Sequence, residues 1–255
     1  MRSASLAAPR RLLAGLLAAS LLFVSAPAQT SAARTYTLDL GVRADFVAQT
    51  NFVQCVGASM QMMLNMIEPG RDRSAKTQLR LQKLARGRSG PRPDGTQRQG
   101  ASVSGWATGL NIEGAGPYKL AGAKTLAGAL RIAAKAIRTT GKPVGLLMWH
   151  GRHAWVMSGF RATADPLLTD DFTVTAVIVE DPLYPFGSRV WGPSPRPGEA
   201  LTPKQLGRQF VPRRTHSIWN FQRWAANLAG KYVMVVPFKA VAVQPDYAGF
   251  APVHR

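Results

Sequence analysis

Acidic residues and cysteine are both scarce in this chain of 255 residues, which has 13 Asp and Glu against 32 Lys and Arg, and one cysteine. The formal net charge of +19 favours anionic partners. The single cysteine, Cys55, excludes an internal disulfide and a zinc site built on several thiolates. Cys55 is therefore interpreted either as a small buried apolar residue or as a reactive thiol.

Long apolar runs are also scarce, and the only one lies between residues 12 and 24. Arginines precede it, and Ala26-Pro27-Ala28 follows it in the small-x-small form of a cleavage site. The run of about 13 residues is short for a membrane-spanning helix, which needs about 20. We expect residues 1–33 to be a secretory signal peptide and short linker, cleaved near residue 28 or after Ser31-Ala32-Ala33. The protein is then secreted, extracellular or periplasmic and wall-associated, and touches the membrane only through this segment.

The basic charge persists without that segment, because removing its three arginines from the formal charge of +19 leaves +16. Outside a cell, such a charge attracts anionic cell-wall polymers, which we expect as partners beside a peptide or protein substrate. The densest basic stretch, residues 71–98, contains no aromatic residue on which a base could stack. We therefore expect no specific nucleic-acid binding.

Residue patterns predict one domain over residues 34–255, with helices mostly preceding strands. Apolar spacing and stop signals predict helices over 55–67, 74–86, 105–110, 125–138 and 203–208. Runs of β-favouring residues predict strands over 118–120, 144–149, 154–160, 173–179 and 231–238. Residues 86–103 and 182–203 are predicted loops. This order indicates an α+β fold, in which an N-terminal helical half packs on a C-terminal antiparallel sheet.

Cys55 stands at the predicted start of a helix, where unpaired amides and the helix dipole stabilise a thiolate. Small residues follow it at positions 57–59, so the backbone is accessible and the Cys55 amide is a candidate donor to an oxyanion. A side-chain amide six residues earlier, Gln49, is a candidate second donor. Asn51 and Gln54 lie on the same segment and are alternatives.

A histidine base and a residue that orients it complete the candidate site. Of the histidines at positions 150, 153, 216 and 254, His153 is favoured, because it stands at the start of a predicted strand. His150, at the end of the preceding strand, is the alternative. Asp181 ends the next strand and is held extended by the following proline. Glu180 points to the opposite face, so we expect only Asp181 to reach the histidine.

The order Gln, Cys, His, Asp resembles the papain-like cysteine peptidases, and most closely the secreted members similar to double-glycine-leader (bacteriocin-processing) peptidases. The similar segments are "QTNFVQCVGASMQMML", "TGKPVGLLMW", "GRHAWVMSGF" and "VIVEDPLYP". The resemblance implies a papain-like fold with Cys55 as nucleophile, His153 as base, Asp181 as orienting residue and Gln49 in the oxyanion hole. It implies hydrolysis of an amide bond through a thioester, without metal or cofactor.

One departure from the family pattern concerns the nucleophile helix, where the usual Cys-Gly-Pro is replaced by Cys55-Val56-Gly57. Transporter domains, which accompany the leader-processing members, are absent from this sequence, so double-glycine specificity is not expected. Three alternatives remain open at this point: a cell-wall peptide amidase, a transglutaminase-like acyl transferase, and a non-catalytic wall-binding module on a peptidase scaffold.

Overall fold

A seven-stranded antiparallel sheet forms the centre of the part of the chain that the computed structural model describes, residues 35–68, 70, 72–90, 96, 98–214 and 228–239. The expected signal segment and the tail beyond residue 239 lie outside these residues. The strands are β1 (Tyr36–Asp39), β2 (Tyr118–Ala123), β3 (Val144–Met148), β4 (His153–Ala162), β5 (Val174–Glu180), β6 (Gly187–Ser188), β7 (Gly192–Pro193), β8 (Glu199–Leu201) and β9 (Tyr232–Pro237). The helices are α1 (Cys55–Ile67), α2 (Ala75–Gly87), α3 (Val103–Ile112), α4 (Leu126–Thr140) and α5 (Pro203–Leu206), with a 3-10 turn η1 (Arg43–Asp45).

The strand order is β2-β9-β3-β4-β5-β8, and β1 also pairs with β4. On one edge of β4, β3 pairs with its first half up to Met157, and β1 pairs with its second half from Gly159. β5 runs along the other edge. The expected α+β class with an antiparallel sheet is confirmed. The central strand is β4, which begins at His153.

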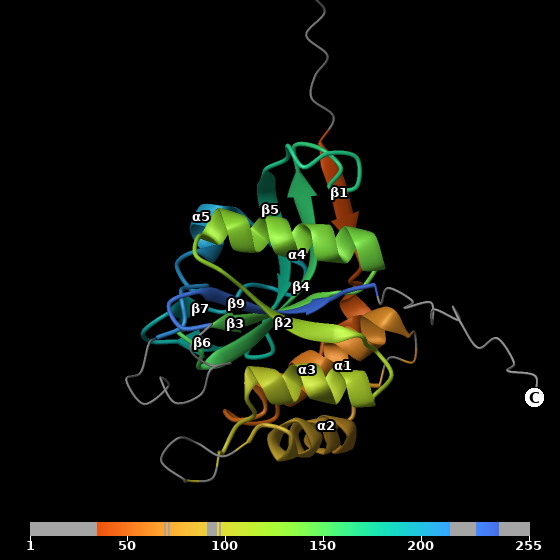
Figure 1. Cartoon of the computed structure of the whole chain (residues 1–255). Coiled ribbons are helices and arrows are strands. Elements are labelled where there is room, and N and C mark those ends of the chain that lie inside the picture. Colours follow the sequence, from red (N-terminus) through yellow and green to blue (C-terminus); the bar gives the residue numbers. More distant parts are fainter. Residues whose placement is uncertain are drawn as a thin grey trace, which may run out of the picture. The chain divides into compact units, whose positions relative to one another are not determined.

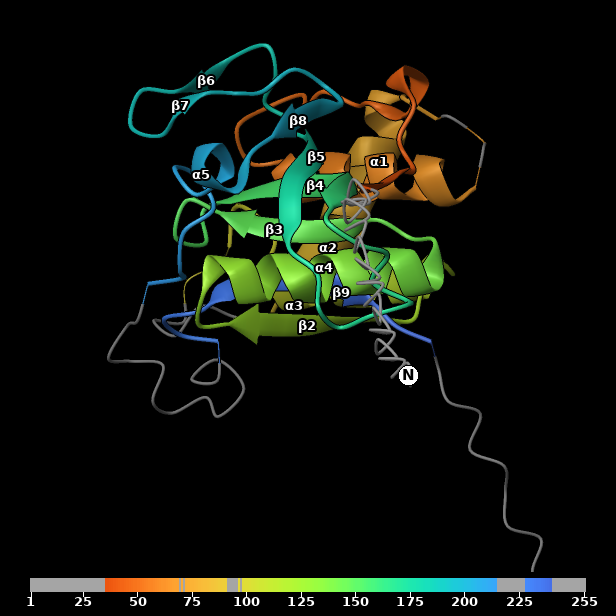
Figure 2. The ribbon, with the colours of Figure 1, turned by 90° about the horizontal axis from the view of Figure 1, so that it is seen from above.

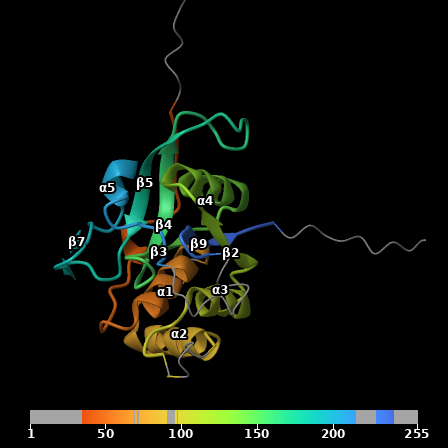
Figure 3. The same cartoon turned by 60° about the vertical axis from the view of Figure 1, so that its left-hand side comes forward.

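Helices cover both faces of this sheet (Figure 1). α4 lies across one face, and α1, α2 and α3 lie on the other, with α1 between the sheet and α2 (Figure 3). Alternation along β4 divides the core accordingly, because Trp155 and Met157 pack on the α4 side, whereas Ala154 and Val156 pack on the α1 side. The expected N-terminal helical half is therefore formed by α1, α2 and α3 alone.

Local sequence signals set the helix ends. α1 has the predicted bounds and ends where Glu68 adopts an extended conformation. The hydroxyl of Thr125 accepts a hydrogen bond from the Gly128 amide at 3.1 Å, which caps the start of α4. α4 ends at Gly141, whose φ of 66° is the left-handed conformation that glycine favours at helix ends.

Two expectations from the sequence were incomplete. Within the described residues the strand β1 precedes the helices and was not predicted, because β4, with which it pairs, lies more than a hundred residues away in the chain. Residues 182–203 are not a plain loop. They contain a short hairpin of β6 and β7, which extends beyond the sheet edge (Figure 2), and β8, which pairs with β5.

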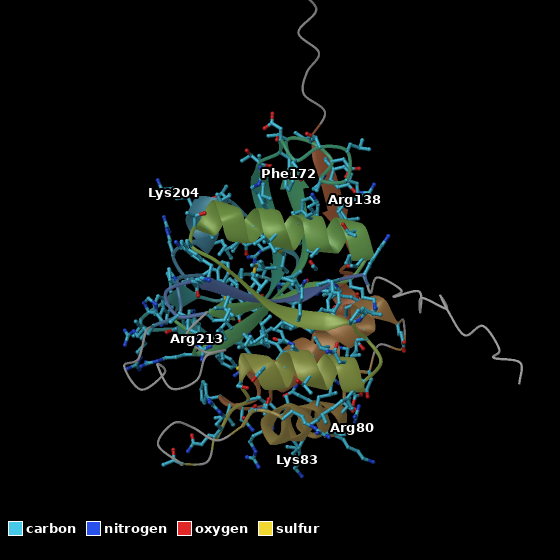
Figure 4. All side chains as sticks on the ribbon, in the orientation of Figure 1. Arg80, Lys83, Arg138, Phe172, Lys204 and Arg213 are labelled. Atoms are coloured by element: carbon cyan, nitrogen blue, oxygen red, sulfur yellow. The ribbon has the colours of Figure 1, made fainter. Side chains whose placement is uncertain are left out.

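Basic side chains are prominent on the helical side of the molecule. Arg80 and Lys83 project from α2 away from the sheet (Figure 4). Arg80 pairs with Glu113 at the end of α3, with nitrogen and oxygen 2.6 Å apart. None of the helices in the described residues is long and apolar enough to cross a membrane.

Candidate active site

Cys55 is the first residue of α1, and its side chain is partly exposed. The amide of Ala58 donates to the carbonyl of Gln54 at 3.0 Å, which closes the first turn of the helix. The amides of Cys55 and Val56 have no hydrogen-bond acceptor within the described residues. The partial positive charge of a helix start is therefore available beside the sulfur atom.

Two glutamines of α2 hold the segment that leads into Cys55. Gln78 accepts a hydrogen bond from the Thr50 amide at 2.8 Å and donates to the Ala48 carbonyl at 2.9 Å. Gln82 accepts from the Gly57 amide at 2.9 Å. A side chain at Gly57 would come within 2.8 Å of Gln82, so the glycine allows α2 to approach this closely. Packing between α1 and α2 therefore accounts for the glycine at position 57.

α1 is attached to the sheet next to the histidine strand. The Ser59 hydroxyl donates to the carbonyl of Ala154 at 3.3 Å, and both residues are buried. Val56 and Met60 belong to the same apolar cluster as Val156 of β4. These contacts fix the start of α1 relative to the start of β4, and so bring Cys55 to His153.

His153 opens β4 directly after the turn that follows β3, and only 4% of its surface is exposed. Its Nε2 lies 2.7 Å from Oδ1 of Asp181. The Cys55 thiol is close enough to the ring to act on its charge, and both residues line one cleft. Because Nε2 is engaged by Asp181, Nδ1 is the nitrogen left for the thiol. The structure therefore brings the three residues together, with the histidine between the thiol and the carboxylate.

Asp181 is fully buried just beyond the end of β5. Its Oδ1 also accepts a hydrogen bond from the Leu183 amide at 2.8 Å, which fixes the carboxylate. Glu180, in contrast, pairs with Val156 and shares the α1 face of the sheet. The predicted difference between the two acids is confirmed, and only Asp181 contacts the histidine.

The pKa of His153 reflects two opposing effects. Burial disfavours the charged ring and lowers the pKa, but hydrogen bonds to Asp181 and to Cys55 outweigh it and raise the pKa to about 9. The imidazolium form therefore dominates at neutral pH. A protonated imidazole beside a cysteine stabilises the thiolate, which is the reactive form of the side chain.

Trp149 stacks on the ring of His153 and was not among the residues predicted for the site. The two rings are stacked with centroids 4.1 Å apart. Trp149 has a φ of 55°, an uncommon conformation for a bulky residue, and its indole nitrogen donates to Gln209 at 2.9 Å. Such strain is typical of functional sites, where the surrounding structure holds it. One signal in the sequence was available: this tryptophan stands next to the turn that precedes the candidate base.

His150, the alternative base, points elsewhere. Its Nδ1 lies 2.6 Å from the carbonyl oxygen of Pro212, and its ring meets Trp191 edge to face. His216 and His254 lie outside the described residues. Of the histidines that the structure describes, His153 is the one in contact with Cys55.

The side chain of Gln49 forms a hydrogen bond within its own loop. Its Nε2 donates to the Asn51 carbonyl at 2.9 Å, and its backbone amide donates to the carbonyl of Pro182. The side-chain oxygens of the two alternatives are engaged as acceptors, since Asn51 accepts from the Val53 amide and Gln54 accepts from the Thr50 hydroxyl. Backbone amides at the start of α1 are further donors beside Cys55.

Cys55 and His153 line an open cleft of about 220 Å³. Its walls include Phe52, whose side chain is largely exposed, and Arg152. Arg213 packs behind Gly151, another residue of the wall, and burial together with the charge of Arg98 lowers its pKa to about 10. Positive charge thus gathers at this end of the cleft. Among the described residues, no three His, Cys, Asp or Glu side chains are placed to hold a metal ion.

Comparison with known proteins gives no match to a protein-family model, to a curated protein or to a solved structure. What the cleft does is therefore inferred from its geometry and chemistry alone.

Proposed function

We propose that this protein is a papain-like cysteine hydrolase that cleaves an amide bond of a peptide through a thioester on Cys55. The observation that supports it is the proximity of Cys55, the first residue of a helix, to a histidine that is hydrogen-bonded to Asp181, in an open cleft. A helix with the nucleophile, packed on an antiparallel sheet whose strand begins with the histidine, is the arrangement that the sequence resemblance implies.

In the proposed acylation, the Cys55 thiolate attacks the carbonyl carbon of the scissile amide. The negative charge that develops on the carbonyl oxygen is met by the amide of Cys55 and by the positive end of α1. His153 then gives its proton to the amide nitrogen, the carbon–nitrogen bond breaks, and an amine leaves. The acyl group remains on the sulfur as a thioester, and His153 is neutral.

Deacylation reverses these roles. Neutral His153 takes a proton from water, and the resulting hydroxide attacks the thioester carbon. The carbon–sulfur bond breaks, a carboxylic acid leaves, and the thiolate and imidazolium are restored. Asp181 accepts the hydrogen bond of Nε2 throughout, which keeps Nδ1 directed at the sulfur and at the substrate. Gln49 donates one Nε2 hydrogen to the Asn51 carbonyl, which leaves the second hydrogen of its amide for the oxyanion hole.

The charge at the cleft favours an anionic substrate. Arg152 lines the wall, Arg213 lies behind Gly151, and Arg98 acts on Arg213 electrostatically. A peptide with a carboxylate side chain next to the scissile bond would be drawn to this end of the cleft. Secretion, as the N-terminal segment suggests, would bring the protein to peptides outside the cytosol.

A thiol-directed epoxide or vinyl sulfone probe tests the proposal on the full chain at pH 7. We expect rapid labelling of the wild-type protein and none of Cys55→Ala. His153→Ala should label at least about tenfold more slowly at pH 7 and recover only near the ordinary cysteine pKa of about 8.5. His150→Ala is the matched control and should label normally. Full reactivity of His153→Ala at pH 7 would show that Cys55 is not activated by that histidine.

Cleavage of peptides is measured in parallel by mass spectrometry, with and without an added amine. Hydrolysis yields a free carboxylic acid at the new end, whereas acyl transfer yields an amide of the added amine. A protein that labels but converts no peptide in either assay would contradict the proposed activity.

A further inference from the structure

A second cavity, larger than the Cys55 cleft, is lined by Glu180, the neighbour of Asp181 in the chain. Its volume is about 720 Å³, within the range of small-molecule sites. Its walls come from the segment around η1, the start of α2 and the connection before β8, and they include Arg43, Arg73, Glu180, Tyr184 and Arg196. No residue of the Cys55 cleft contributes to them.

Glu180 forms the buried part of this cavity, with 4% of its surface exposed. Its Oε2 is buried and has no hydrogen-bond partner among the described residues. Its Oε1 faces Gly198, another wall residue, whose φ of 74° favours glycine. A Cβ at Gly198 would stand about 4.0 Å from Oε1, so this residue lies next to the carboxyl.

The surroundings of this carboxyl are negative. Burial raises the pKa of Glu180 to about 8, and the charges of Asp39 and Asp45 act in the same direction. Both aspartates serve the local backbone, because Asp39 accepts from the Gly41 amide and Asp45 from the Val42 amide, each at 3.0 Å. Glu180 is therefore the acid available to a ligand, and a cationic group would replace its proton.

The rim of the cavity has the opposite charge. Arg43, Arg73 and Arg196 are exposed, and no described acidic side chain forms an ion pair with any of them. The rings of Phe46 and Tyr184 meet edge to face at 6.2 Å and provide an apolar wall between rim and interior. A ligand that satisfies both ends must carry a cation and an anion at some distance from each other.

We propose that this cavity is a second binding site, which takes a short peptide with free termini, the ammonium group on Glu180 and the carboxylate on the rim arginines. A dipolar ligand of this class matches the charge at each end, and the cavity volume accommodates a few residues. The proposal stands apart from the function of Cys55, since neither its residues nor its ligand groups involve the thiol.

Titration calorimetry on the full chain tests it with three probes, namely trialanine, N-acetyl-trialanine and trialanine amide. Cys55→Ala is used beside the wild-type protein, so that cleavage does not disturb the measurement. We expect trialanine to bind and each blocked probe to bind at least about tenfold more weakly. Measurements at pH 7 in two buffers of different ionisation enthalpy should show a proton released from Glu180 on binding of trialanine.

Variants test separately the contacts proposed for the ammonium end and for the carboxylate end of the ligand. Glu180→Gln should weaken trialanine at least about tenfold, abolish the proton release and leave N-acetyl-trialanine unchanged. Arg196→Ala and Arg43→Ala should weaken trialanine but not its amide, and the exposed Arg208→Ala is the control. Absence of trialanine binding, or equal binding to Glu180→Gln, would overturn the proposal.

The Cys55 cleft must also be excluded as the place where trialanine binds. Wild-type protein whose Cys55 has been blocked by the epoxide probe should bind trialanine with unchanged affinity. Loss of binding after this treatment would place the peptide in the Cys55 cleft and overturn the second site. Failure of the probe to label Cys55 contradicts the proposed hydrolase but leaves the calorimetric test intact, because Cys55→Ala is measured separately.

Discussion

The indole ring of Trp149 is stacked on the imidazole ring of His153, with centroids 4.1 Å apart and planes inclined by 23°. Trp149 is itself held by Gln209, through its side chain and through its backbone amide at 3.0 Å. The stack restricts the imidazole to the plane in which it meets both Asp181 and Cys55. Trp149 is thus a positioning residue for the proposed base.

Replacing Trp149 by alanine should therefore impair turnover more than binding. We expect kcat to fall about tenfold, with KM little changed, because a 1 Å displacement of a catalytic group is costly. Trp149→Phe, which retains a ring, should recover part of the rate. Trp191→Ala is the matched control, since Trp191 contacts His150 instead. A larger effect of Trp191→Ala would refute this role of Trp149.

Stability should depend on pH through His153. The pKa of its ring is raised from 6.5 to about 9, so the folded protein binds the proton more tightly than the unfolded chain. This contribution is complete below pH 6.5 and is lost as pH rises to 9, by up to about 3 kcal/mol. Urea unfolding between pH 6 and 9 measures it.

Asp181→Asn should reduce that dependence, because asparagine accepts a hydrogen bond but carries no charge. We also expect kcat to fall by about 10²-fold or more, since the amide favours the wrong ring tautomer. The charge-removing change at the adjacent residue, Glu180→Gln, should leave kcat near the wild-type value. If the effects of the two variants were exchanged, the assignment of Asp181 as the orienting residue would be wrong.

Glu180 should destabilise the fold at alkaline pH. Burial, with help from Asp39 and Asp45, raises its pKa from 4.5 to about 8. The folded protein therefore holds a proton that the unfolded chain has lost, and stability falls as pH rises from 4.5 to 8, by up to about 5 kcal/mol. Glu180→Gln should unfold at higher urea than wild type at pH 8.5, and equally at pH 4.5. The exposed Glu68→Gln is the control.

Arg152 should select acidic substrates. We expect Arg152→Ala to lower kcat/KM about three- to tenfold for peptides with Asp or Glu beside the scissile bond, and to leave neutral peptides unaffected. Raising the ionic strength should weaken the preference in the wild-type protein. Arg161→Ala, an exposed arginine further along β4, provides the comparison. A uniform loss over all peptides would indicate a role in folding of the turn instead.

Export is tested by sequencing the N-terminus of the secreted protein. Cleavage after Ala28 gives a chain that begins with Gln29, and cleavage after Ala33 gives one that begins with Arg34. Recovery of only full-length chain, in the membrane fraction, would contradict the expected signal peptide.

Local patterns in the sequence predicted those features of the structure that depend on residues close together in the chain. Apolar spacing and the stop at Glu68 gave the bounds of α1, and strand alternation separated Glu180 from Asp181. The meeting of Cys55 with His153 was expected only through the family resemblance, because it depends on how α1 packs on β4. Spacing from the cysteine did not predict the conformation of Gln49, which is set by its own loop.

Features that depend on distant contacts were missed. Gln78 and Gln82 were not singled out from the sequence, yet both are buried and bind the backbone around Cys55. Their spacing of four residues puts them on one face of α2, which was the available signal. The left-handed conformation of Trp149 was not predicted, because its partners Gln209 and His153 come from other parts of the chain or fold.

The pairing of β1 with the second half of β4 sets a limit to proteolytic maturation. Tyr36 lies opposite Ala162 and Asp39 opposite Gly159, so the chain is committed to the sheet from residue 36 onward. Cleavage at either expected site leaves this strand intact. A protease that trimmed past Asp39 would remove the backbone partners of residues 159–162, the outer half of the strand that begins at His153.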